Sequence, residues 1–254
     1  MNAPFERVVL LEASGAKHLV NLDRETVKIP SVGVVRADTL QGLLGRRWTI
    51  GDRTFLVMVP SIRDEIESVR REAQIIGTKD APALLWNCDV KPGDFVVEIG
   101  AGSGALTLAL AHAVGSKGRV VTYDIRPEFL DRARDNVTAA DLEGVVEFKI
   151  GDGRKGVVER GADAMILDIP DPWEAVDGAA TVLRPCGHFA SYSPNMEQVN
   201  RTVATLRKST FVEIRSVEII EREIVAHEAG THPSFAPLGH TGYLTFARKV
   251  LDTF

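Results

Sequence analysis

Residues 94–115 read DFVVEIGAGSGALTLALAHAVG, and they decide the fold. The apolar run through Val96 and Val97 predicts a buried strand, and the Ala/Leu-rich run that follows predicts a helix. Between the two stands a glycine-rich turn, in which Gly100 and Gly102 permit backbone conformations and close approaches that a side chain would block. A strand, a tight glycine turn and a helix in this order predict a nucleotide-like ligand at the helix N-terminus.

From about Pro82 onward, predicted strands alternate with predicted helices. This alternation is typical of an α/β fold, in which a parallel sheet carries helices on both faces. The expected helices are residues 83–90, 105–115, 127–140, 175–183 and 197–209, and the expected strands are 94–100, 119–125, 145–152, 163–169, 187–194, 213–226 and 241–250.

The first 65 residues have a different pattern. Short alternating runs broken by Gly, Asp and Pro predict a small antiparallel β unit. The segment SIRDEIESVRR, residues 61–71, predicts a charged linker helix. We therefore expect a small β domain over residues 1–65, for RNA binding or assembly, and a Rossmann-like domain over residues 66–254.

The glycine turn by itself does not identify its ligand. Gly100, Gly102 and Ala105 also satisfy the dinucleotide pattern G-x-G-x-x-A, so NAD and S-adenosylmethionine both remain open. Asp124, at the end of the next predicted strand, would accept hydrogen bonds from ribose hydroxyls in either case.

Three further acids favour S-adenosylmethionine. Glu98 immediately precedes the turn, where an acid can help to organise a cationic ligand. Asp152, in IGDGR, follows the third strand and is placed to meet an adenine amino group. Asp168 ends the fourth strand and is followed by Ile-Pro-Asp-Pro-Trp, in which Pro170 and Pro172 are expected to prevent an immediate helix and to stiffen an extended turn.

In these segments the sequence resembles the tRNA adenine-N(1)-methyltransferases of the TrmI type, in archaeal form. The resemblance runs from about Arg70 to Val250. It is carried in order by REAQIIGTKDA, VVEIGAGSGALTLALAHAVG, LDIPDPWEAV and HTGYLTFARKV. It implies methyl transfer from S-adenosylmethionine to N1 of an adenine in the T-loop region of tRNA, of the position 57/58 type, with S-adenosylhomocysteine as product. It also implies a cytoplasmic homo-oligomer, expected to be a tetramer, with tRNA as its partner.

The resemblance assigns roles to individual positions. Asp168 would be the catalytic acid–base group, Asp124 would hold the ribose, and Asp152, with Gly153 beside it, would hold the adenine. Gln74 lies in the approach segment near the mouth of the cofactor site. The remaining expected cofactor contacts belong to the turn: Glu98, Gly100, Gly102, Ser103, Gly104, Ala105 and Leu106. No metal is expected.

Two positions depart from the family pattern. Members often carry an aromatic residue or His two places before the Lys-Asp of the approach segment, where this chain has Gly77. The candidates to stack on the target base instead are Trp173, Tyr192 and Phe235. Members also often have Arg-Pro in the C-terminal loop, where this chain has His232 before a proline, so a phosphate contact there is open.

The net charge of −5 argues against a protein that coats nucleic acid non-specifically. A local basic surface remains possible, because arginines gather before the main domain at positions 46, 47, 53, 63, 70 and 71. No apolar run approaches the roughly 20 residues of a membrane helix. The two cysteines, Cys88 and Cys186, lack metal-ligand spacing and fit a reducing compartment.

Three other functions stay open. A methyltransferase acting on a small molecule or a protein carboxylate would share the glycine turn, although it would not be expected to carry DIPDPW and HTGY. A non-catalytic RNA-binding subunit is disfavoured because the turn and Asp168 are both intact. An NAD-dependent dehydrogenase would need a proton relay that the sequence does not show.

Overall fold

A computed structural model describes residues 6–29, 32–69, 76–227, 230–235 and 239–253. The chain divides into two compact units, Met1–Val69 and Arg70–Phe254. Helix α2, Ile62–Ser68, lies in the first unit, where Glu65 pairs with Arg7 and Asp64 accepts from Lys17 Nζ at 2.6 Å. The predicted boundary stands four residues earlier than the observed one, at 65 instead of 69.

The first unit is built on a four-stranded antiparallel sheet in the order β2-β1-β6-β5. A separate hairpin, β3–β4, and a one-turn helix, α1, complete a core around Leu10, Leu40 and Phe55. Strand β1 does not alternate between buried and exposed residues, because its three buried residues, Val8 to Leu10, are consecutive. The elements are β1 Arg7–Glu12, β2 Lys17–Asn21, β3 Thr26–Ile29, β4 Gly33–Arg36, α1 Ala37–Gln41, β5 Arg47–Ile50 and β6 Arg53–Met58.

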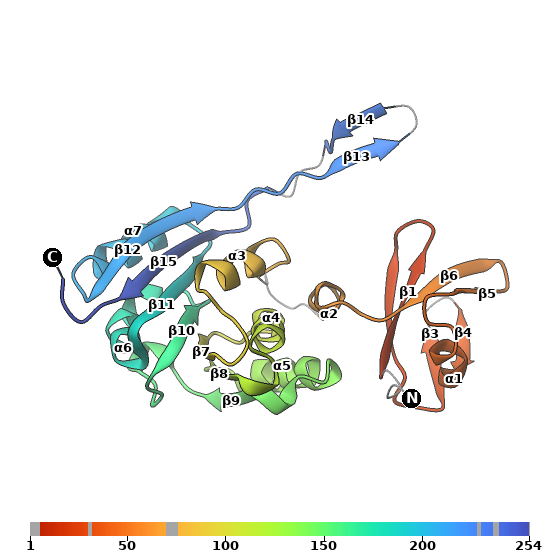
Figure 1. Cartoon of the computed structure of the whole chain (residues 1–254), viewed down its shortest axis with the longest axis horizontal. Helices are drawn as coiled ribbons and strands as arrows, with labels where there is room; N and C mark the ends of the chain where they lie inside the picture. Colours follow the sequence, from red (N-terminus) through yellow and green to blue (C-terminus); the bar gives the residue numbers. More distant parts are fainter. Residues whose placement is uncertain (1–5, 30–31, 70–75, 228–229, 236–238, 254) are drawn as a thin grey trace. The chain divides into compact units, whose positions relative to one another are not determined.

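The second unit contains a seven-stranded sheet in the order β12-β15-β11-β10-β7-β8-β9 (Figure 1). Its five strands from β11 to β9 are parallel, and β15 and β12 are antiparallel to their neighbours. The predicted α/β fold class is thus confirmed. The strands are β7 Phe95–Ile99, β8 Arg119–Asp124, β9 Val146–Ile150, β10 Ala162–Leu167, β11 Leu183–Ser193, β12 Phe211–Glu218, β13 Ile224–His227, β14 Gly230–Pro233 and β15 Tyr243–Lys249.

Helices cover both faces of this sheet. Helices α6 and α7 pack with Val97, Met165 and Phe189 into one continuous core cluster. Helices α3, α4 and α5 follow one another across the opposite face, as Figure 1 shows. The helices are α3 Asp80–Asn87, α4 Ala105–Val114, α5 Pro127–Ala139, α6 Val176–Val182 and α7 Met196–Leu206, with short 3-10 turns η1 Gly115–Lys117, η2 Glu143–Val145, η3 Gly153–Lys155 and η4 Pro172–Ala175.

The single strand expected over residues 213–226 is wrong. The structure contains β12 in the large sheet and β13 in a separate two-stranded hairpin with β14. Between them, the carbonyl of Ile219 accepts a hydrogen bond from Lys79 Nζ at 2.7 Å. This carbonyl accepts from a side chain and not from the backbone of β15. The contact therefore marks the point where the pairing between β12 and β15 ends.

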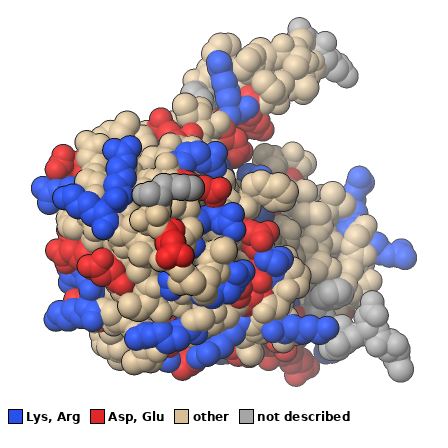
Figure 2. Space-filling model, turned by 60° about the vertical axis from the view of Figure 1, so that its left-hand side comes forward, with Lys and Arg blue, Asp and Glu red and all other residues tan. Residues whose placement is uncertain are grey.

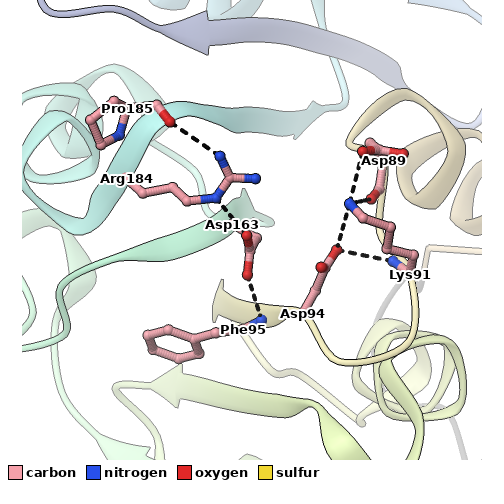
Figure 3. A network of polar contacts seen from close by, with 7 residues as sticks. All are labelled: Asp89, Lys91, Asp94, Phe95, Asp163, Arg184 and Pro185. Atoms are coloured by element: carbon pink, nitrogen blue, oxygen red, sulfur yellow. Dashed lines mark hydrogen bonds and ion pairs between the residues drawn. The ribbon is translucent and has the colours of Figure 1, made fainter.

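Ion pairs join the strands at their amino ends (Figure 3). Asp163, in β10, accepts from the Phe95 amide of β7 at 2.8 Å and from Arg184 Nε of β11 at 2.5 Å. In the loop before β7, Lys91 Nζ lies 3.5 Å from Asp94. These contacts tie three adjacent strands at one end, and the opposite, carboxyl end is the one that lies beside the glycine turn.

A buried polar cluster connects two segments that are distant in sequence. Lys79 Nζ donates to Asp80 at 2.8 Å and to the Thr241 hydroxyl at 2.6 Å, and that hydroxyl donates to the other oxygen of Asp80 at 2.6 Å. The Lys79 and Asp80 side chains are only 1% and 0% exposed. Lys79 and Asp80 of the approach segment therefore form a buried ion pair, and hydrogen bonds of both side chains with the Thr241 hydroxyl hold them to the C-terminal HTGY segment.

We predict that Lys79→Met lowers the free energy of unfolding by about 3–5 kcal/mol, because it leaves the charge of Asp80 buried without a partner. The measurement is urea denaturation followed by circular dichroism. The double variant Lys79→Met/Asp80→Asn is the control, and it should be more stable than the single variant. A single variant within about 1 kcal/mol of wild type would show that the pair is not desolvated.

Candidate functional site

The carboxyl ends of four parallel strands meet beside the glycine turn. Asp124 ends β8, Asp152 follows β9 by two residues, and Asp168 directly follows β10. They line a pocket of about 230 Å³ at this edge, which is where doubly wound sheets bind ligands. Its lining residues are Ile99, Gly100, Tyr123, Asp124, Ile125, Arg126, Gly151, Asp152, Gly153, Arg154, Asp168, Ile169 and Pro170.

Gly100 brings the turn into contact with the end of β10. Its φ is +96°, and a Cβ placed there would lie 2.1 Å from the carbonyl oxygen of Asp168. The amide of Asp168 in turn donates to the Ile99 carbonyl at 2.8 Å. The backbone that carries Asp168 can therefore lie against the turn only because position 100 has no side chain.

The turn is also fixed to β8. The amides of Gly100 and Ala101 both donate to the Tyr123 carbonyl, at 2.7 and 3.0 Å. The amide of Gly102 donates to the Asp124 carboxylate at 3.1 Å. Asp124 is thus positioned by the same loop that opens helix α4.

Each of the two acids assigned to the cofactor is held by an arginine two residues further on. Arg126 Nε lies 3.1 Å from Asp124 Oδ1, and Arg154 donates Nε and Nη2 to the two oxygens of Asp152 at 2.9 and 3.0 Å. The hydrogen bonds from Arg154 hold the pKa of Asp152 below its ordinary value. Both arginines line the pocket, and the sequence analysis did not single them out. The shared pattern Asp-x-Arg after two successive strands was the signal that could have identified them.

Asp168 is in a different electrostatic position. Its carboxyl group makes no hydrogen bond with the part of the chain that the structure describes. Burial raises its pKa to about 7, the charge of Asp124 adds to this effect, and Arg126 opposes it. A carboxyl group without an internal partner, titrating near neutrality in a pocket, is typical of a functional site.

Glu98 lies beneath the turn and does not line the pocket. Its side chain is fully buried, and Oε2 accepts a hydrogen bond from the Thr107 hydroxyl of α4 at 2.6 Å. Burial raises the pKa of Glu98 to about 8. The geometry gives Glu98 the role of joining β7 to α4, and a direct contact with a cationic ligand stays a prediction.

The other predicted turn residues lie at the start of α4. Gly104, with φ +85°, is the residue that precedes the helix, and Ala105 and Leu106 are buried in its first turn. The Ser103 hydroxyl is buried and has no hydrogen-bond partner among the described residues. Gln74 lies outside the described residues, so its predicted place near the mouth is not addressed.

The prediction that the two prolines exclude a helix holds for only part of the segment. Residues 168–171 are non-helical, but Pro172 is the first residue of the 3-10 turn η4, which leads directly into α6. Proline is favoured at that first position because its missing N–H would be unpaired there in any case. Four residues, 168–171, therefore separate β10 from η4, and Pro172 fixes where the helical turns begin.

The candidates to stack on a base are placed differently. Tyr192 is only 4% exposed and its hydroxyl donates to the Thr241 carbonyl, so its proposal as a stacking residue is wrong. Trp173 is half-buried with the Arg201 guanidinium 5.1 Å from its ring centroid. Phe235 is exposed, and its ring lies 4.9 Å from that of His232.

No group of three or more His, Cys, Asp or Glu that could hold a metal ion occurs within the described ranges. Across the same ranges, no helix combines the length and the apolar character that crossing a bilayer requires. Cys88 is buried and Cys186 is exposed, and both are free thiols.

Comparisons with known proteins converge on one family. Residues 64–234 match the profile of the family described as "tRNA methyltransferase complex GCD14 subunit". The chain is 38% identical over 221 residues to the tRNA (adenine(57)-N(1)/adenine(58)-N(1))-methyltransferase TrmI of Methanocaldococcus jannaschii, covering 77% of this chain and 78% of that protein.

Solved structures agree with this result. A crystal structure from Thermotoga maritima described as a SAM-dependent O-methyltransferase superposes with a TM-score of 0.90 and 31% identity, over 99% of this chain and 96% of that one. The tRNA (m1A58) methyltransferase TrmI from Aquifex aeolicus superposes with a TM-score of 0.79 and 25% identity, over 98% of each chain.

We predict that Gly100→Ala lowers the free energy of unfolding by at least about 3 kcal/mol, because the added methyl group must displace the Asp168 backbone in addition to straining φ. Gly102→Ala is the matched control: its φ is also positive, at +54°, but no described atom lies within 4 Å of the added Cβ. It should cost about 1 kcal/mol. Equal losses in the two variants, measured by urea unfolding, would contradict the contact.

A second prediction concerns Glu98. An acid whose pKa is raised by folding stabilises the protein fully below its unfolded pKa of 4.5, and that stability is lost as the pH rises through about 8. Glu98→Gln removes this titration. The stability of the variant relative to wild type should therefore increase between about pH 5 and pH 8 and become constant above that. A pH series of thermal melts measures it, and a pH-independent difference would contradict the assignment.

Proposed function

The chain belongs to the family of the tRNA methyltransferase complex GCD14 subunit, and on this basis we propose that it methylates N1 of an adenine in tRNA. The methyl donor is S-adenosylmethionine, the product is S-adenosylhomocysteine, and the target lies in the T-loop region, of the position 57/58 type. One observation of this chain carries the proposal: Asp168 faces the ligand pocket at the carboxyl edge, held against the glycine turn by Gly100.

The residues present fit such a cofactor. Asp152 Oδ1 accepts two hydrogen bonds from Arg154 and Oδ2 accepts one, so one acceptor position remains for an amino group. The oxygens of Asp124 already take four contacts, of which the longest, 3.4 Å, comes from the half-exposed Arg126 side chain. Ribose hydroxyls would replace that contact.

Further pocket residues suit the remaining parts of the cofactor. Ile125 and Ile169 offer apolar surface to the faces of an adenine ring. Outside this lining, the amides that open α4 and the Ser103 hydroxyl, which has no hydrogen-bond partner among the described residues, are polar groups available to a ligand at the turn. S-adenosylmethionine, when bound, supplies a methyl group on a positively charged sulfur.

Asp168 acts on the acceptor. Adenine N1 has a lone pair and no proton, so no strong base is required. The Asp168 carboxylate accepts a hydrogen bond from the neighbouring N6 amino group, which orients the ring and stabilises the positive charge that develops on it. Ile169 lines the same pocket, and we assign its carbonyl to the second N6 proton. Because the pKa of Asp168 is about 7, the active ionised form accumulates as the pH rises through neutrality.

The RNA must present the adenine outside its stack, at a cost of roughly a few kcal/mol. We assign part of the RNA contact to the first unit, where Arg46 and Arg47 are exposed. Arg53 pairs with Glu12 there, and Arg70 and Arg71 lie outside the described residues. Figure 2 shows basic and acidic side chains interspersed over the face in view, which supports local phosphate contacts in place of a uniformly basic surface.

We assign the protein to the cytoplasm and to a homo-oligomer, expected to be a tetramer as the family resemblance implies. The β13–β14 hairpin supports assembly, because two strands alone are marginally stable in water and Ile224 is 57% exposed there. The second candidate function is methyl transfer to an oxygen atom, which the name of the Thermotoga maritima structure favours, and we take small hydroxylated molecules as the acceptors to test.

We predict that the protein forms 1-methyladenosine in unmodified tRNA and that Asp168→Ala reduces the rate at least about 100-fold, since it removes the group that stabilises the developing charge. Mass spectrometry of nucleosides after incubation with S-adenosylmethionine measures the product. The wild-type rate should rise with pH to a plateau, with a midpoint near 7, and the residual rate of Asp168→Asn should show no such step.

The control is Asp177→Ala, which removes an exposed carboxylate from the first turn of α6 and should leave the rate unchanged. A panel of small hydroxylated acceptors is assayed in parallel. If the tRNA stays unmodified while a small acceptor is methylated on a hydroxyl group, the proposal is wrong and the second candidate function takes its place.

A further inference from the structure

We propose that Arg154 is a positioning residue that couples occupancy of the cofactor pocket to the loop carrying Asp168. The proposal rests on the proposed function, which assigns Asp152 to the cofactor, and it extends that function to a residue with no assigned role. Its effect would be that a filled pocket sets the position of the catalytic loop before the RNA base arrives.

The geometry of Arg154 is that of a bridge between two segments. One edge of its guanidinium, Nε and Nη2, faces Asp152 at 2.9 and 3.0 Å. The remaining nitrogen, Nη1, lies 3.3 Å from Asp171 and 4.0 Å from Glu174, both in the segment after Asp168. Asp152 and Asp171 thus accept hydrogen bonds from different nitrogens of one planar group, and Glu174 adds an ion pair to Nη1.

The chemistry of arginine explains why the bridge can transmit a displacement. Its guanidinium is rigid and planar, so a movement of the edge on Asp152 also moves the edge on Asp171. The Arg154 side chain is 34% exposed, which leaves these contacts only partly screened by water. An amino group that arrives at the open acceptor position of Asp152 alters the contact on one edge and therefore the position of the other.

The loop end of the bridge is also held by packing, since Pro172 and Ala175 of η4 are buried. Asp171 precedes the 3-10 turn η4, yet its side chain makes no capping hydrogen bond with it. Removing the Asp171 carboxylate therefore removes the hydrogen bond between the bridge and the loop without removing a cap, and leaves the longer contact with Glu174 at 4.0 Å. Gly153 also packs closely beneath the bridge, because a Cβ there would lie 2.3 Å from Ile99. The β9 end of the bridge is thus fixed by packing, and at the loop end the Asp171 side chain is joined to the bridge by the hydrogen bond from Arg154 Nη1.

Arg126 provides an internal comparison. It also pairs with an acid two residues earlier and also lines the pocket, but its contacts are with Asp124 and with the Phe129 ring, 3.6 Å from the guanidinium carbon. It has no contact with the Asp171 segment among those described. Loss of Arg126 should therefore weaken cofactor binding without disconnecting the loop.

Trp173 can report on the conformation of the loop that carries Asp168 and Asp171. It lies two residues after Asp171 and does not line the pocket. The chain has three tryptophans, so the full-length protein labelled with 5-fluorotryptophan should give three fluorine resonances, and Trp173→Phe identifies the relevant one. S-adenosylhomocysteine is the probe, and calorimetry gives its Kd independently of any acceptor.

The expected result separates binding from coupling. In the wild type, saturation with S-adenosylhomocysteine shifts the Trp173 resonance. Asp171→Ala should bind the probe with a Kd within about threefold of wild type, since it does not touch Asp152, but should lose at least two thirds of the shift. Arg154→Gln should lose both affinity and shift, and Asp177→Ala, which removes a carboxylate without an ion pair, should lose neither.

Kinetics give a second readout. For 1-methyladenosine formation, Asp171→Ala should lower kcat at least fivefold with little change in the KM for S-adenosylmethionine, whereas a purely structural role would lower only the melting temperature. A full Trp173 shift in Asp171→Ala, or no shift in the wild type despite binding, overturns the proposal. Absence of any binding heat in the wild type overturns the cofactor assignment as well, and binding with a shift but no 1-methyladenosine overturns only the proposed acceptor.

Discussion

The close approach of two backbones at Gly100 is the constraint on which the site depends. A carbonyl oxygen of the β10 loop occupies the space where any other residue would place its Cβ. The same turn donates its amides to the end of β8, so one glycine-rich segment fixes the relative positions of Asp124 and Asp168. The proposed chemistry requires both acids at one edge, and the turn brings them there without any contact between their side chains.

The electrostatics of the carboxyl edge of the sheet depend on which of its three acids, Asp124, Asp152 and Asp168, is paired with an arginine. Asp124 and Asp152 are each paired with an arginine, whereas Asp168 makes no such pair among the described residues. The acid that would meet a changing charge is therefore the one whose pKa, about 7, lies near neutral pH. Glu98, more deeply buried, has its pKa raised still further and serves the structure of the turn.

Contacts between distant segments complete the arrangement. The Lys79–Asp80 pair holds the approach segment to Thr241, and Arg154 joins the end of β9 to the segment after β10. In both cases a cation lies between two acceptors from different parts of the chain. Such bridges determine how loops that follow different strands are placed relative to one another, which is the property that an active site assembled at a sheet edge needs.

The sequence by itself determined the fold class, the glycine turn and the acids at the strand ends. Strand and helix periodicities are local, and the carboxyl ends of parallel strands must meet at one edge. The non-helical stretch after Asp168 could be predicted in part from the sequence, because Pro170 and Pro172 restrict the backbone conformation of the residues beside them. Tertiary structure alone decided which acids are paired, where Glu98 points, and that Tyr192 is buried. Tertiary structure also decided where β12 ends, because the carbonyl of Ile219 accepts a hydrogen bond from Lys79, 140 residues earlier in the chain. Such contacts depend on side chains that meet only after folding.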